Sequence, residues 1–325
     1  MSDNLSSKKV VLFGTGKMGV EYSKVLQYLG ANFSVVGRSE AGVERFYKET
    51  GIRAIPHGFS AWREKCEANF EFAIVAVSVE ELSETTINLM NIGVKKILLE
   101  KPAGLNTQEV RLVREKAEET ETNIIIGYNR RFYASVLKAQ EIIKEDGGVQ
   151  SFNFEFTEWV HTIPDHIKAE VKKNWFLANS SHVADLAFFL GGEPKYMTSF
   201  TAGGCDWHPA ATIFCGAGVT RDGALFSYQA NWFAPGRWSA EFLTRQHRLI
   251  LRPLEKLHVQ FPKSVAIELL EIDDRLDIDF KPGLYKQTNF FLRDIDHPNF
   301  ITINKHYEYV VNHYRKMVNP NLSLT

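Results

Sequence analysis

The feature that most constrains this chain is its glycine-rich segment, Gly14-Thr15-Gly16-Lys17-Met18-Gly19. A candidate strand at residues 8–13, apolar from Val10 to Phe13, precedes it, and apolar residues recur at helical spacing over 17–29. In such a strand–turn–helix the first glycine permits a tight turn, the second lets the backbone approach a pyrophosphate, and the third lets the helix pack closely. The N–H groups at the helix start then face the phosphates. The segment predicts dinucleotide binding; a glycine-rich turn without a ligand is the alternative.

Short apolar runs alternate with helical patterns through the first half of the chain. The runs lie at 33–36, 72–77, 96–99 and 123–126, and amphipathic segments lie between them at 40–50, 80–91 and 107–120. Continuous apolar strands joined by helices are typical of a parallel sheet covered on both faces. We therefore expect residues 1–127 to form an α/β, Rossmann-type NAD(P)-binding domain. Thr107 is a candidate cap for the helix at 107–120.

Aromatic residues and alternating patterns dominate the second half. Candidate strands lie at 149–160, 196–202, 212–214, 224–233, 239–243 and 247–251. They predict an open, mostly antiparallel sheet flanked by helices over residues 128–325, a domain for substrate binding and oligomerisation. The aromatic stretch 226–233 is expected in the core of this sheet or on a face between subunits. A terminal helix at 305–318 can pack back on the first domain.

Composition argues against several classes of partner and cofactor. Lys and Arg number 38 and Asp and Glu number 39, a net charge of −1, so no basic excess points to nucleic acid or a membrane surface. Cys66, Cys205 and Cys215 form no CxxC pair, and the histidines lack metal-ligand spacing, so we expect neither disulfides nor a metal. No signal-peptide core or membrane-length apolar run is present. These features predict a cytoplasmic protein.

The second apolar run indicates which dinucleotide binds. In NAD-binding folds this strand usually ends in Asp or Glu, which holds the ribose 2′-OH. Here it ends in Gly37-Arg38-Ser39. Arg38 can stack on adenine and pair with a 2′-phosphate, and Ser39 can donate a hydrogen bond to that phosphate. We expect NADP rather than NAD; a solvated loop arginine is the alternative.

The tripeptide Glu100-Lys101-Pro102 ends another apolar run. Ligand sites of parallel sheets lie beyond the carboxyl ends of the strands, so Lys101 is expected to face the cofactor crevice. Its ammonium group can hydrogen-bond a substrate hydroxyl or a developing alkoxide. A surface lysine before a turn would look the same.

Four motifs occur in order along the chain: GTGKMG at 14–19, GRS at 37–39, EKP at 100–102 and GYNRRF at 127–132. In these motifs the chain resembles the Gfo/Idh/MocA oxidoreductases, a family that includes glucose–fructose oxidoreductase and inositol dehydrogenases. Members use NAD(P) to oxidise or reduce a hydroxyl or carbonyl on a sugar, polyol or nucleotide sugar. The open sheet of their second domain supports dimers or tetramers.

This resemblance implies roles for individual residues. Lys101 would be the central catalytic residue, and Arg130 or Arg131 would help to build the substrate site, for which we select Arg131. Many members have a histidine where this chain has Leu82, so that contact is not transferred. Cofactor contacts would come from Gly14, Thr15, Gly16, Lys17, Met18, Gly19, Arg38, Ser39, Ser78, Glu100, Lys101 and Asn129.

A histidine-bearing segment lies at residues 178–192. His182, Asp185 and Phe189 share one face of a helix through their spacing, and one of residues 179–181 can cap it. A buried polar pair that docks the helix is one interpretation. Family members carry H-x-x-D-L here, so the resemblance implies that His182 is catalytic.

The chain departs from the family just before His182. Many members have D-x-G-x-H-x-x-D, and Ala178 stands here in place of the first, catalytic aspartate. Asn179 is the nearest polar replacement. The preceding segment 159–175 is rich in basic and aromatic residues, as in a substrate-facing loop. We assign Trp175, Asn179 and Asp185, with Arg131, to substrate binding.

The leading hypothesis is an NADP-dependent oxidoreductase acting on a hydroxyl or carbonyl carbon of a sugar, polyol or nucleotide sugar, in surface-polysaccharide biosynthesis. The nicotinamide supplies the hydride chemistry and the protein aligns the reacting atoms. The missing aspartate leaves open a regulatory or scaffold protein that binds the cofactor with little turnover. A reductase of a non-sugar carbonyl or imine is a further alternative. A homodimer or homotetramer through the C-terminal sheet is expected.

Overall fold

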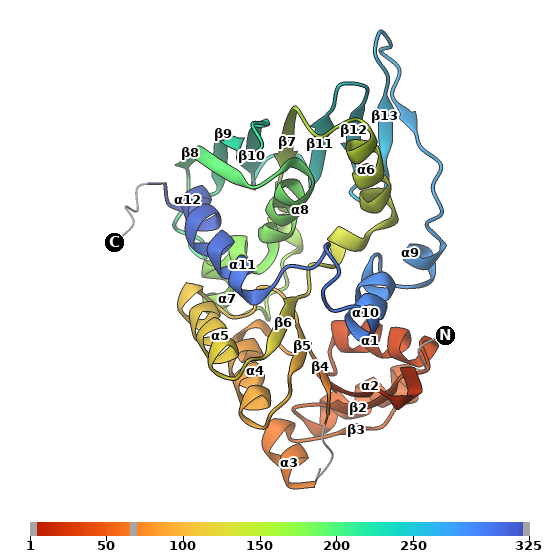
Figure 1. The fold of residues 1–325 in the computed structure, drawn as a ribbon. Coiled ribbons are helices and arrows are strands. Elements are labelled where there is room, and N and C mark those ends of the chain that lie inside the picture. The colour runs from red at the N-terminus through yellow and green to blue at the C-terminus, as the bar shows by residue number, and fades with distance from the viewer. Residues whose placement is uncertain (1–4, 66–69, 321–325) are drawn as a thin grey trace. The chain divides into compact units, whose positions relative to one another are not determined.

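The structure is a computed structural model that describes residues 5–65 and 70–320, so Cys66 lies outside the described residues. The chain divides into two compact units (Figure 1). The first contains Met1–Asn129 and Leu276–Tyr307, and the second contains Arg130–Arg275 and Glu308–Thr325. Residues 276–307, which the sequence-based boundary assigned to the second domain, belong to the first unit. Leu284, Phe291 and Leu292 join its hydrophobic core.

The first unit is built on a six-stranded parallel sheet in the order β3-β2-β1-β4-β5-β6. The order reverses between β1 and β4, which is where ligands bind in doubly wound sheets. Val10, Leu12, Ile74 and Leu98 are fully buried, as expected of strands covered on both faces. The predicted Rossmann-type sheet is confirmed. Its strands are β1 (Lys9–Phe13), β2 (Asn32–Val36), β3 (Ala54–Ile55), β4 (Phe72–Val75), β5 (Lys96–Leu99) and β6 (Asn123–Ile126).

Helices join these strands, and one cap differs from the prediction. Asn106 rather than Thr107 caps α5, because its Oδ1 accepts the backbone N–H groups of Gln108 and Glu109. Among the described residues, no helix is long and apolar enough to span a membrane. The helices are α1 (Lys17–Tyr28), α2 (Glu40–Thr50), α3 (Gly58–Lys65), η2 (Val79–Glu81), α4 (Leu82–Asn91), α5 (Thr107–Glu119), α9 (Arg275–Asp279), α10 (Leu284–Arg293) and α11 (Ile303–Tyr309).

The second unit contains an eight-stranded sheet in the order β14-β13-β12-β11-β7-β10-β9-β8. Strands β7 and β10 pair in parallel and the other neighbours are antiparallel, which confirms the predicted mostly antiparallel sheet. The strands are β7 (Ser151–Glu155), β8 (Pro194–Ala202), β9 (Ile213–Thr220), β10 (Leu225–Asn231), β11 (Ser239–Leu243), β12 (Arg248–Leu251), β13 (His258–Gln260) and β14 (Glu268–Leu269).

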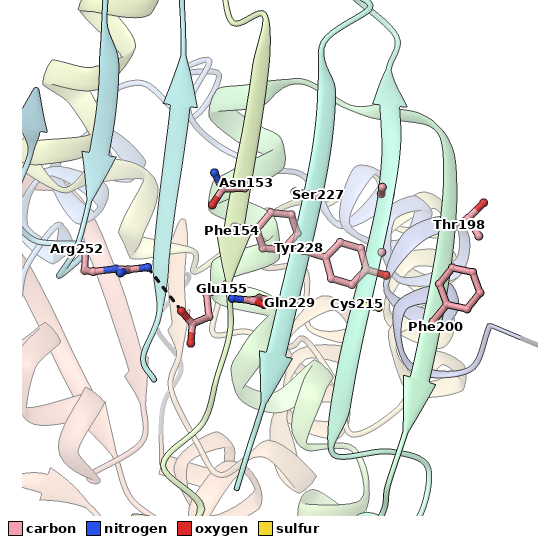
Figure 2. Close-up of a pocket in the computed structure, with 12 residues that line it drawn as sticks. Asn153, Phe154, Glu155, Thr198, Phe200, Cys215, Ser227, Tyr228, Gln229 and Arg252 are labelled. Atoms are coloured by element: carbon pink, nitrogen blue, oxygen red, sulfur yellow. Dashed lines mark ion pairs between the residues drawn. The ribbon is translucent and has the colours of Figure 1, made fainter. Parts of the chain in front are cut away.

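Helices α6 (Ala134–Glu145), α7 (Ala169–Lys173), α8 (Ser181–Gly191) and α12 (Arg315–Val318) complete the second unit. One face of its sheet forms the core. Phe152 and Phe226 stack at 5.3 Å, and the ring of Phe188 on α8 meets Phe226 edge-on at 5.5 Å. The aromatic stretch after residue 225 is therefore sheet core at alternate positions. The other face is exposed and contains a shallow hollow of about 570 Å³ (Figure 2).

Candidate functional site

The glycine-rich turn joins β1 to α1, and its three glycines meet different surroundings. A Cβ on Gly14, whose φ is +121°, would lie 2.2 Å from the carbonyl oxygen of Ala76. A Cβ on Gly19 would lie 2.0 Å from the Gly14 carbonyl oxygen, whereas one on Gly16 would meet no atom within 4 Å. The outer glycines permit close packing, and the middle one borders open space at the start of α1. These residues fit a pyrophosphate there.

The loop after β2 carries Arg38 and Ser39. The Arg38 guanidinium, 69% exposed, donates to the carboxylate of Glu81. That hydrogen bond and the charge of Glu81 hold the pKa of Arg38 above its usual value. The Ser39 hydroxyl caps α2 by accepting the Gly42 N–H at 3.2 Å, and its own proton stays available for donation. Ser78 precedes η2, the turn that contains Glu81.

Glu81 is therefore part of this region, although the sequence analysis did not select it. Its only signal in the sequence was the acidic pair Glu80-Glu81 after an apolar strand. Lys17 and Met18 occupy the first turn of α1, and Thr15 packs its side chain beside Gly37.

The Glu-Lys-Pro turn follows β5 and is supported from two sides. Glu100 is 8% exposed and accepts the Tyr22 hydroxyl at 2.7 Å. Burial raises the pKa of Glu100, against the hydrogen bond from Tyr22 and the positive charge of Lys101. His306, fully buried, lies with Nε2 3.0 Å from the Pro102 carbonyl oxygen, so this nitrogen carries the proton.

Lys101 is partly exposed at the carboxyl end of β5, and the Lys101–Pro102 peptide is cis. Asn129, expected beside the cofactor, is buried and donates through Nδ2 to the Pro282 carbonyl oxygen at 2.9 Å. Tyr22 and His306 belong to none of the four motifs, so the sequence did not indicate either residue.

In the second unit, Arg131 and Asp185 form a buried bidentate ion pair. The Arg131 Nε lies 2.8 Å from one carboxylate oxygen of Asp185, and a terminal nitrogen lies 2.6 Å from the other. Their side chains are 7% and 1% exposed. The pKa of Asp185 is raised by burial, which the charge and hydrogen bonds of Arg131 oppose. The pair ties the turn that precedes α6 to α8, and each side chain neutralises the charge of the other.

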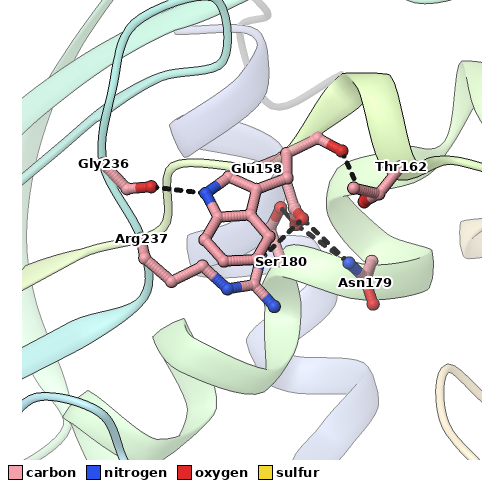
Figure 3. Close-up of polar contacts among 7 residues, drawn as sticks. Glu158, Thr162, Asn179, Ser180, Gly236 and Arg237 are labelled. Atoms are coloured by element: carbon pink, nitrogen blue, oxygen red, sulfur yellow. Dashed lines mark hydrogen bonds and ion pairs between the residues drawn. The ribbon is translucent and has the colours of Figure 1, made fainter.

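The histidine helix begins differently from the prediction. A π-helical turn, Phe176–Ser180, leads into α8, and Ser180 makes no side-chain cap. Asn179 and Ser180 instead hold Glu158, which follows β7 (Figure 3). The Asn179 amide donates to the Glu158 carboxylate at 2.9 and 3.1 Å, and the Ser180 hydroxyl donates at 2.6 Å. Glu158 is 3% exposed and places a carboxylate beside the two residues that follow Ala178.

His182 lies in the first turn of α8 and is 6% exposed. Its ring centroid is 6.3 Å from that of Trp238, which precedes β11. Trp175 meets Trp207 edge-on at 6.3 Å in a separate aromatic cluster. The structure thus brings His182, Asn179 and Glu158 together at the start of α8. The sequence analysis missed Glu158, whose only signal in the sequence was its position beside Trp159.

The candidate residues fall into two sets, one in each unit. The first unit holds the glycine turn, the Arg38 loop, Ser78, the Glu-Lys-Pro turn and Asn129. The second unit holds the proposed substrate residues Arg131, Trp175, Asn179 and Asp185, with His182.

Comparison with known proteins gives matches in structure. No protein-family model and no curated protein sequence matches the chain. UDP-N-acetylglucosamine 3-dehydrogenase GnnA from Acidithiobacillus ferrooxidans is 16% identical with a TM-score of 0.72, over 95% of this chain and 96% of that one. Levoglucosan dehydrogenase in complex with NADH and L-sorbose is 16% identical with a TM-score of 0.72, over 94% of each chain.

A third similar structure is an oxidoreductase from Agrobacterium radiobacter in complex with NAD+, L-tartaric acid and magnesium. It is 12% identical with a TM-score of 0.73, over 94% of this chain and 93% of that one. These neighbours are two dehydrogenases and an oxidoreductase, and the matches cover 94–95% of this chain. The likeness confirms the expected architecture at the level of the fold.

Proposed function

We propose that this chain is an NADP-dependent oxidoreductase that transfers a hydride between nicotinamide and a hydroxyl or carbonyl carbon of a sugar, polyol or nucleotide sugar. The observation that carries the proposal is the turn at Gly16. It is open to solvent at the N-terminus of α1, where the strand order of the sheet reverses. A pyrophosphate bound there would meet backbone N–H groups and the positive end of the helix. The similar folds of levoglucosan dehydrogenase in complex with NADH and of an oxidoreductase in complex with NAD+ support the same class.

The preference for NADP over NAD is part of this proposal and rests on Arg38 and Ser39. The strand β2 ends without a carboxylate to hold a ribose 2′-OH, and Arg38 offers a planar, permanently charged fork to a phosphate. The hydroxyl proton of Ser39 adds a second donor. To bind the phosphate, Arg38 must exchange or share its contact with Glu81.

The catalytic roles are assigned to Lys101 and His182. Bound nicotinamide would supply the hydride chemistry. Lys101 would donate a hydrogen bond to the substrate oxygen and stabilise negative charge that develops on it. The buried hydrogen bond from His306 to the Pro102 carbonyl oxygen holds this turn and so fixes the position of the Lys101 backbone. His182 would move the proton of that oxygen, from a position in the first turn of α8.

The remaining second-unit candidates receive different roles. We propose that Arg131 and Asp185 position α8, since each is buried against the other. Asn179 orients the Glu158 carboxylate. Trp175, which meets Trp207 in a separate aromatic cluster, is retained as a candidate for substrate binding. A substrate from surface-polysaccharide biosynthesis is compatible with these groups.

The first experiment is calorimetric titration of the cofactor-stripped protein with NADP and NAD, on the wild type and Arg38→Ala. Tight NADP binding that collapses in the variant is expected. Equal or better NAD binding would overturn the Arg38 argument. Binding of neither nucleotide would favour a scaffold protein without a cofactor.

A turnover assay on sugars, polyols and nucleotide sugars separates the enzyme from a cofactor-binding regulator. Lys101→Ala is expected to abolish turnover and leave cofactor affinity within a fewfold of the wild type. If no substrate is turned over and the variant alters only stability, the regulatory alternative is favoured. Turnover of a non-sugar carbonyl or imine alone would favour the third alternative.

We also propose that a second copy of the chain covers the exposed face of the second sheet. Tyr196 and Phe200 on β8 expose 67% and 64% of their surface, and Leu225 on β10 exposes 63%; β9 lies between these two strands. Apolar side chains clustered on an open face are typical of a subunit interface. Phe200→Glu is expected to shift the mass measured by light scattering from a dimer or tetramer to a smaller species. Phe233→Glu, at an equally exposed loop position (63%), is the matched control.

A further inference from the structure

Two arginines of the second unit lie against one tryptophan. The guanidinium carbon of Arg130 is 4.7 Å from the centroid of Trp238, and that of Arg237 is 4.5 Å from it. Arg237 also lies 4.7 Å from the ring of Trp159. Both charges are within 4.7 Å of one point, so they are closer together than the Debye length of about 10 Å at 0.1 M salt. Like charges held this close favour an anion between or beside them.

One nearby carboxylate offsets part of this positive charge. Glu158 forms an ion pair with Arg237 at 3.9 Å, beyond hydrogen-bond distance, so one negative charge faces two guanidinium groups. Its oxygens already accept from Asn179 and Ser180 (Figure 3). Within the described residues, Arg130 forms no ion pair, and its buried Nε has no hydrogen-bond partner.

The donors of this cluster remain available. When a guanidinium stacks on an indole, its face contacts the ring, and its in-plane N–H groups can still donate hydrogen bonds. Trp238 is 6% exposed, and its indole N–H has no partner among the described residues. An unpaired buried donor of this kind costs free energy unless a ligand or water accepts from it. Arg237 is 44% exposed and gives access from solvent.

The loop that carries Arg237 and Trp238 is fixed in place. The Gly236 carbonyl oxygen accepts the Trp159 indole N–H at 2.8 Å. A Cβ on Gly236 would lie 2.3 Å from a carboxylate oxygen of Glu155, so the loop packs tightly on the end of β7. The donors are therefore preorganised rather than carried on a free loop.

We propose that Arg130, Arg237 and the Trp238 indole form a binding site for an oxyanion, a carboxylate or phosphoryl group, on the substrate. The site adjoins His182, whose ring is 6.3 Å from Trp238. That the anion belongs to the substrate rests on the proposed function; the anion site itself does not. The substrate class narrows to acidic sugars, sugar phosphates or nucleotide sugars.

The test titrates the full-length protein, without cofactor, with glucuronate, glucose 1-phosphate and neutral glucose at low salt. The readouts are calorimetry and the indole ¹H–¹⁵N resonance of Trp238, assigned with Trp238→Phe. One of the two anions is expected to bind and to shift that resonance, and glucose is not. Binding of glucuronate alone would identify a carboxylate as the ligand of the site, and binding of glucose 1-phosphate alone would identify a phosphoryl group. Arg237→Gln is expected to weaken binding by about tenfold or more, because it removes a charge-assisted donor.

Arg248→Gln is the matched control, since Arg248 is also 44% exposed in the same unit and pairs with Glu241. It is expected to leave anion affinity within about twofold. If neither anion shifts the Trp238 resonance, or if both arginine variants weaken binding equally, the site is refuted. Parallel titration with NADP and NAD tests the proposed function separately: anion binding without nucleotide binding would retain this site and reject the dehydrogenase.

Discussion

The guanidinium of Arg38 is bound to the carboxylate of Glu81 in the region where a dinucleotide's adenosine end is expected. A cofactor with a 2′-phosphate would therefore meet an arginine with an acid already beside it. Two like unit charges about 4 Å apart in water repel by about 1 kcal/mol, which is about fivefold in Kd. Glu81 thus sets how strongly Arg38 can favour NADP.

Glu81→Gln is accordingly expected to tighten NADP binding by about fivefold and to leave NAD within about twofold. Calorimetric titration with both nucleotides measures this. Glu84→Gln, at an exposed position on α4, is the control and should change neither affinity. Weaker NADP binding in Glu81→Gln would contradict the argument and show that Glu81 holds Arg38 in its binding position.

Substitutions at Gly16 and Gly19 in the glycine-rich turn are expected to affect cofactor affinity and stability differently. Gly16→Ala places a methyl in open space, so unfolding free energy should change by less than about 1 kcal/mol, as for an N-cap glycine replaced by alanine. The same methyl occupies the expected path of the pyrophosphate, and cofactor affinity should fall by about tenfold or more. Urea unfolding and nucleotide titration give the two values.

Gly19→Ala provides the contrast. Its methyl would meet the Gly14 carbonyl, and a loss of stability of about 1–3 kcal/mol is expected from overpacking. Unchanged cofactor affinity in Gly16→Ala would show that no phosphate approaches this backbone.

Glu100 predicts a pH dependence of stability. Burial raises the pKa of Glu100 above 4.5, so the folded state binds the proton of this carboxyl group more tightly than the unfolded state does. Its contribution to stability is present below pH 4.5 and is lost as the pH rises through the raised pKa. Glu100→Gln keeps an acceptor for the Tyr22 hydroxyl but cannot ionise. Its unfolding free energy, relative to the wild type, is expected to increase between pH 5 and pH 7.5, as measured by urea unfolding at each pH.

Glu118→Gln, which removes an exposed carboxylate in the same unit, is the control. A difference between Glu100→Gln and the wild type that stays constant with pH would mean that Glu100 does not titrate in this range.

The Arg131–Asp185 pair predicts coupling between two buried residues. Asp185→Asn leaves a buried guanidinium without its counter-charge, and a loss of about 3–5 kcal/mol is expected. The double variant Arg131→Met/Asp185→Leu removes both charges and should recover most of that stability. Denaturant unfolding of both variants and of Arg131→Met gives the coupling energy. Additive losses would show that the ion pair does not position α8.

The first sheet could be predicted from sequence because each strand is a continuous apolar run between helical patterns. The glycine turn was equally local: Gly14, Gly16 and Gly19 lie within six residues and perform their roles through the backbone. The alternation of Phe226 and Tyr228 with exposed residues likewise predicted one covered face of the second sheet. These features depend on periodicity and on neighbours close along the chain.

Residues that act across large sequence separations could not be found this way. Glu158 reaches Asn179 and Ser180 from a different element, and His306 supports a proline more than two hundred residues earlier. The segment 276–307 joins the first unit only because its apolar helix face completes the core of that sheet.

The sequence by itself determined the two kinds of sheet and the cofactor turn, because local pattern and backbone chemistry carry that information. Tertiary structure alone decided which charges meet. Arg38 pairs with Glu81, and Asp185 pairs with Arg131. The Trp238 indole N–H, stacked against Arg237, has no hydrogen-bond partner among the described residues. Pairing between charges that are far apart in the chain depends on distance in space, which residue spacing does not encode.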